Sequence, residues 1–85
     1  MWVVTTQAVA QLPGEEITQI NTIVAKLASE GTTSPDPIIE GMPLPSGLGE
    51  RQRSFTTLAA AEEYADVINN LPSDLVNVTG IEQLV

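Results

Sequence analysis

The residues that most directly suggest chemistry in this chain are Arg51 and Arg53. They are two positions apart, so in a β-strand both side chains project from one face and can clamp a carboxylate or a phosphate. The composition supports an alternative, because the chain has 11 acidic and only 3 basic side chains. In that interpretation the arginines pair with nearby acids and help to keep an edge strand from aggregating.

Catalysis by the familiar arrangements of side chains is excluded, because the chain contains no histidine and no cysteine. Catalytic triads, thiolate nucleophiles and the usual imidazole or thiolate metal sites all need one of these residues. A Ser–Lys pair would have to use Lys26, which lies on the polar side of a predicted helix. We therefore predict no catalytic residue, no metal site and no cofactor, and hence a protein that is not an enzyme.

Acidic side chains on a second predicted helix suggest cation binding. Glu62 and Asp66 are four positions apart, so they share a helix face and, with Asn69, could coordinate Ca²⁺ or Mg²⁺. This spacing is common, however, and the sequence has no EF-hand calcium-loop pattern. A solvated acidic helix face is the favoured interpretation.

Nucleotides and nucleic acids are not expected ligands of this chain. Gly47 and Gly49 start a dinucleotide-binding pattern, but its third glycine is replaced by Gln52, and the Gly-Lys pair of a phosphate loop is absent. The formal net charge of −8 leaves no basic surface with which to neutralise the phosphates of DNA or RNA.

A membrane partner is not expected either. No apolar run approaches the roughly 20 residues of a transmembrane helix, and an acidic surface is repelled by anionic lipids. The apolar residues 1–4 are not preceded by a basic region and do not read as a secretory signal. A cytoplasmic location is therefore expected.

Helical periodicity predicts two amphipathic helices. The first covers residues 15–30, with Gly31 beyond its C-cap. The second covers residues 58–71, with Thr56 or Thr57 as its N-cap and a proline directly after its end. Their apolar stripes consist of Ile17, Ile20, Ile23, Val24 and Leu27 in the first, and of Leu58, Ala61, Tyr64, Ala65, Ile68 and Leu71 in the second.

Alternating patterns predict three strands, which cover residues 2–10, 51–55 and 75–79. A further strand is a candidate at Ile38–Glu40, inside a Pro/Gly-rich excursion over residues 32–54. Gly80 either ends the last strand or forms a bulge in it. Residues 81–85 either continue that strand or form a tail that packs on a neighbour.

Together these elements predict a single α+β domain over residues 1–85. The order is that of a small ferredoxin-like β-α-(β-β)-α-β sandwich, in which two helices cover one face of a mainly antiparallel sheet of three or four strands. The segment 55–71 resembles the second strand–helix unit of small ferredoxin-like proteins, including the dimeric α+β barrel group. Enzymes of that group commonly use a histidine, so the resemblance carries no catalytic residue over to this chain.

Association with another chain is the expected behaviour, because apolar residues are predicted on both faces of the sheet and only one face is covered by helices. A homodimer, another protein partner or the chain's own proline-rich loop would cover the second face. The alternative interface for a homodimer is an edge strand extended by residues 81–85. The residues assigned to this interface are Trp2, Val4, Ile38, Ile39, Leu44, Val76 and Val78. The function expected is that of a non-enzymatic, self-associating or partner-binding domain, as a component of a viral, phage or cellular assembly. The alternative is a domain that binds a small ligand or anion through Arg51, Arg53 and the loop.

Overall fold

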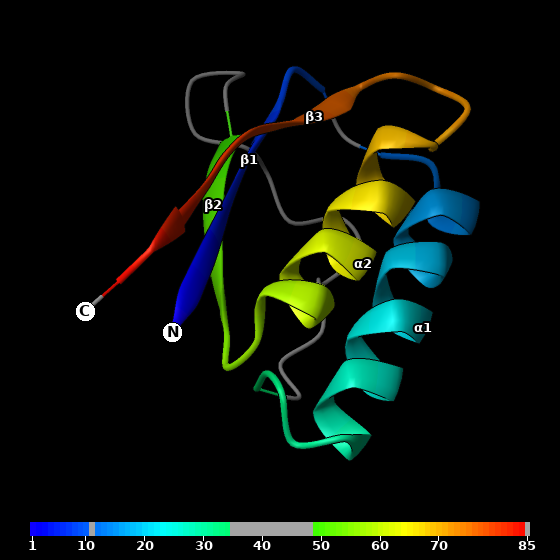
Figure 1. Ribbon diagram of the computed structural model, residues 1–85. Helices are drawn as coiled ribbons and strands as arrows, with labels where there is room; N and C mark the ends of the chain where they lie inside the picture. Colours follow the sequence, from blue (N-terminus) through cyan, green and yellow to red (C-terminus); the bar gives the residue numbers. More distant parts are fainter. Residues whose placement is uncertain (11, 35–48, 85) are drawn as a thin grey trace.

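The computed structural model of the protein describes residues 1–10, 12–34 and 49–84. Along the chain the elements are β1 (Trp2–Ala8), α1 (Gly14–Ser29), β2 (Gly49–Phe55), α2 (Leu58–Asn69) and β3 (Val76–Gln83). The fold is α+β, with two helices side by side on one face of a three-stranded antiparallel sheet (Figure 1). The candidate strand at Ile38–Glu40 lies outside the described residues.

The central strand of the sheet is β1, which pairs with β2 on one side and with β3 on the other. Trp2 lies opposite both Phe55 and Gln83, and Ala8 lies opposite both Gly49 and Val76. Both neighbours are antiparallel to β1, so β2 and β3 run parallel to each other and α2 connects them across the central strand.

The core lies between the helices and the face of β1 that carries Val4, Thr6 and Ala8, all of which are buried. The predicted stripes of both helices face this layer, except that Leu58 remains 38% exposed at the start of α2. Burial of a large aliphatic or aromatic side chain contributes about 1.5–3 kcal/mol, so the largest fully buried residues carry much of the stability. These residues are Phe55, Ile20, Leu27, Ile68, Val4 and Val24.

The ends of the helices follow from local sequence. The Thr57 side chain accepts a hydrogen bond from the Ala60 N–H at 3.2 Å, so of the two candidate threonines it is Thr57 that caps α2. After α1, Gly31 adopts φ +77° and donates its N–H to the Ala28 carbonyl at 3.0 Å. The Thr32 N–H reaches back to the Leu27 carbonyl at 3.0 Å, which completes a Schellman motif.

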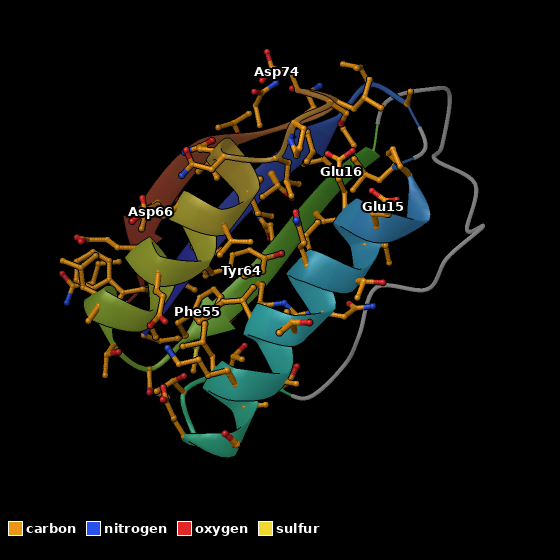
Figure 2. The ribbon with its side chains drawn as sticks, turned by 90° about the vertical axis from the view of Figure 1, so that its right-hand side faces the viewer. Glu15, Glu16, Phe55, Tyr64, Asp66 and Asp74 are labelled. Carbon is orange, nitrogen blue, oxygen red and sulfur yellow. The ribbon has the colours of Figure 1, made fainter. Side chains whose placement is uncertain are left out.

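A buried carboxylate joins the start of α1 to the loop before β3. Glu16 is 5% exposed, and its Oε1 accepts hydrogen bonds from the Ser73 hydroxyl at 2.6 Å and the Ser73 N–H at 3.3 Å. Figure 2 shows Glu16 next to the loop that carries Asp74, a residue with a positive φ of 60°. The contact fixes the turn through which the chain enters its last strand.

The strand predictions hold with changes at the ends. The predicted strand over residues 51–55 is confirmed and starts at Gly49, whereas β1 ends two residues earlier than residue 10. The last strand continues past Gly80 to Gln83, and its register against β1 shifts between Thr5 and Thr6. The continuation of this strand is therefore the correct alternative, with a bulge that absorbs one extra residue.

Candidate functional site

The two arginines lie on β2 and project toward the helix-covered side of the sheet. Arg53 is opposite Val4 and Arg51 is opposite Thr6, and both of these β1 residues are buried beneath the helices. Both arginines are half-buried. Their predicted placement on one face of a strand is therefore met, but this face packs against the helices of the same chain.

Arg53 has several contacts within the protein. Its Nη1 donates a hydrogen bond to the Ser34 carbonyl at 3.0 Å, and its guanidinium carbon lies 5.9 Å from the centre of the Tyr64 ring. The ring of Tyr64 packs in turn on Phe55, with 5.1 Å between ring centroids (Figure 2). Arg53 thus joins the segment after α1 to β2 and α2.

A cavity of about 530 Å³ lies beside Arg53, at the end of the sheet where β2 finishes. Its lining residues are Met1, Gly31, Thr32, Thr33, Ser34, Gln52, Arg53, Ser54, Phe55 and Thr56. Some of its polar groups bond to each other, since the Thr33 hydroxyl donates to the Ser54 carbonyl at 2.8 Å. Arg53, with its bond to Ser34, also belongs to the wall.

The acidic residues of α2 face solvent. Glu62 and Asp66 are exposed, and within the described ranges no group of three or more His, Cys, Asp or Glu residues is arranged to hold a metal ion. Lys26 forms an ion pair with Glu63 that bridges α1 and α2. The hydrogen bond that Lys26 donates to the Glu63 carboxylate, followed by the negative charge of Glu63, raises the pKa of Lys26.

The sheet face away from the helices is mostly polar, which corrects the expectation of apolar residues on both faces. By alternation and register it consists of Val3, Thr5, Gln7, Glu50, Gln52, Ser54, Asn77, Gly80 and Glu82. Only Val3 among these nine has an apolar side chain. The reason is the register of β3, which places Val76 opposite Ala8 and Val78 opposite Thr6, on the covered side.

The residues assigned to an interface therefore have different positions. Val4 and Val76 are buried in the core, where the protein's own helices cover their side chains. Trp2 and Val78 are half-buried and pack against that core. The other three, Ile38, Ile39 and Leu44, lie outside the described residues.

Among the described residues, β3 has no neighbouring strand on its outer side, so the backbone groups on that side are not paired within the sheet. Leu84 donates its N–H to the Met1 carbonyl at 2.8 Å, so the backbone groups of Leu84 point toward the β1 side. This bond establishes which residues of β3 point their backbone groups toward β1 and which point them away. In an antiparallel ladder every second residue turns its N–H and C=O away from the partner strand. Ile81 and Gln83 are those residues here, so their backbone groups point outward.

The start of this edge is protected by a side chain. The outward N–H of Val78 donates to Oδ1 of Asn69, at the end of α2, with a distance of 3.4 Å. The helix begins soon after the end of β2 and finishes over the start of β3 (Figure 1). A side chain from the end of α2 therefore occupies the edge at Val78.

Exposed apolar side chains gather at the same end of the sheet. Met1 is 58% exposed and Leu84 48%, and the two residues are joined by a backbone hydrogen bond. Leu58, also exposed, follows the end of β2, where Phe55 pairs with the half-buried Trp2. We call Met1, Leu58 and Leu84 the apolar end. Sequence periodicity misses it because Met1 and Leu84, which are 83 positions apart, are brought together by strand pairing.

Comparison with known proteins gives no relative for this chain: no family model, no curated protein and no solved structure matches it. In the part of the chain that the structure describes, no helix has both the length and the apolar character needed to cross a membrane.

Proposed function

We propose that this protein is a non-enzymatic association domain and that a second copy of the chain binds along the outer edge of β3. The observation that carries the proposal is the outward-pointing backbone of Ile81 and Gln83, next to the apolar end. Strand addition at an exposed edge supplies main-chain hydrogen bonds, and exposed apolar patches are typical of interfaces.

A second copy fits this edge because the edge is self-complementary. Each outward residue offers one donor and one acceptor, so two antiparallel β3 strands can satisfy each other about a two-fold axis. The sheet face away from the helices is a weaker candidate for the interface, since eight of its nine residues within the strands lack an apolar side chain. The proposal includes a cytoplasmic location and a place in a larger viral, phage or cellular assembly.

Anion binding at Arg51 and Arg53 has less support. Arg53 donates to Ser34 and stacks near Tyr64, so its guanidinium already has a role within the fold. The net charge of −8 further disfavours the approach of an anion.

The finer form of the fold that we propose is ferredoxin-like. In that arrangement the strands occur in the order 4-1-3-2, the first strand is central between the fourth and the third, and all neighbours are antiparallel. The order β3-β1-β2, with α2 joining two parallel strands across the central one, supports this proposal. The candidate for the fourth strand of that arrangement, Ile38–Glu40, lies outside the described residues.

The test is the solution mass of a variant that loses one outer donor. We expect the wild-type chain to sediment at micromolar concentration with twice its mass of 9.0 kDa. Gln83→Pro should sediment as a monomer, because proline has no N–H and is tolerated on an edge strand whose donor points outward. Gln83→Ala keeps the donor and is the matched control, which should remain a dimer. A dimeric Gln83→Pro variant with native circular dichroism would rule out this edge.

A further inference from the structure

The outer edge of β3 also limits how two associated copies can face each other. This inference rests on the function proposed for that edge. Asn69 already occupies the N–H of Val78, so pairing is restricted to the part of β3 after the bulge. The described residues there whose backbone points outward are Ile81 and Gln83. The register of a symmetric pair must bring these groups together.

We infer that Ile81 of each copy pairs with Gln83 of the other, so that the two-fold axis passes between the two Glu82 residues. This register lets both outward residues of both copies exchange backbone hydrogen bonds. Centring the pair on Ile81 instead would place Gln83 opposite Thr79, where the bulge disrupts the ladder. The backbone hydrogen bonds gained in the register centred on Glu82 stabilise the dimer by at least as much free energy as the two facing Glu82 carboxylates cost.

The consequence is a carboxylate pair at the centre of the interface. Glu82 is exposed and lies on the polar sheet face, where its register partner on β1 is Val3. Residues directly opposite at a non-hydrogen-bonded position have Cα atoms about 4.5 Å apart, so the two side chains would face each other closely. Glu82 then limits the strength of the association and makes it sensitive to whatever neutralises that carboxylate.

Cross-linking tests the register directly, because the chain has no cysteine of its own. A Cα separation near 4.5 Å lies within the range that a disulfide spans. We expect Glu82→Cys to form a disulfide-linked dimer under mild oxidation. Glu50→Cys is the matched control: Glu50 is an exposed acid on the same sheet face, but it lies on β2, which β1 separates from β3. It should remain uncross-linked.

A second measurement does not depend on cysteine chemistry. Glu82→Gln removes the facing charges and should lower the dissociation constant of the dimer by up to about fivefold, whereas Glu50→Gln should leave it nearly unchanged. If the wild type is a dimer, and Ile81→Cys cross-links but Glu82→Cys does not, the Ile81–Gln83 register is wrong. Association along the outer edge of β3 would still be supported. A wild-type chain that sediments as a monomer would instead contradict the proposed association itself.

Discussion

At the scale of single residues, Tyr64 has the most informative environment. It is buried between the Phe55 ring and the Arg53 guanidinium, at 5.1 Å and 5.9 Å respectively. Burial raises the pKa of Tyr64 above its ordinary value of 10.0, and the charges of Arg53 and Arg51 act in the opposite direction. The neutral phenol is thus favoured in the folded protein more than in the unfolded chain.

This pKa shift predicts alkaline destabilisation. Below pH 10.0 the phenol is protonated in both states, but above it the unfolded chain releases the proton first, so the free energy of unfolding falls as pH rises. Tyr64→Phe should weaken this dependence, measured as the urea midpoint between about pH 8 and about pH 11. Lys26, whose pKa is also raised, should account for part of the remaining slope. An unchanged slope in Tyr64→Phe would contradict the role of the buried phenol.

At the scale of elements, the helices could be predicted because their signals are local. The 3.6-residue period and the caps lie within the segments themselves, so the C-terminal glycine at Gly31 and an N-cap at Thr56 or Thr57 follow from the sequence. The structure selects Thr57. The burial of Glu16 could not be predicted, because its partner Ser73 is 57 residues away. An acidic residue in the first turn is a common helix signal and does not reveal such a partner.

The sheet was predictable in its order of elements but not in the faces of β3. A strand has a period of two, so one extra residue exchanges the faces of everything that follows. The bulge near Gly80 does this, and it lets both Val78 and Ile81 pack on the covered side. The polar face follows from that pairing, which no local pattern in the sequence contains, although the sequence does suggest a bulge at Gly80 and a strand continued by residues 81–85.

The end of α1 gives a prediction about stability. Gly31 has a φ of +77°, and a Cβ added there would meet nothing within 4 Å, so the cost of a side chain is conformational and not steric. Gly31→Ala should lower the free energy of unfolding by about 1 kcal/mol, measured by urea denaturation. Gly31→Asn is the matched variant and should lose less, since asparagine tolerates this conformation better. Equal losses in the two variants would point to a cause other than backbone conformation.

At the scale of the whole molecule, the charge is distributed unevenly between the two faces of the sheet. Lys26 pairs with Glu63 in the helix layer, and the two arginines project from β2 toward that layer. The nine residues of the polar sheet face include Glu50 and Glu82 but no basic side chain. A second copy added at β3 would extend this face in the same plane, so acidic groups would accumulate without cations between them.

Association of two such molecules should therefore strengthen with salt. Each copy carries a net charge of −8, and the Debye length falls from about 10 Å at 0.1 M to about 3 Å at 1 M ionic strength, which screens the repulsion between copies. We expect the dissociation constant, measured by sedimentation, to decrease as sodium chloride is raised over this range. Glu82→Gln should reduce the salt dependence, because Glu82 is the acid on the proposed edge. Glu15→Gln should retain it, since Figure 2 places Glu15 at the start of α1, away from β3. Weaker association at high salt would mean that opposite charges hold the complex together, and would indicate a basic partner in place of a second copy.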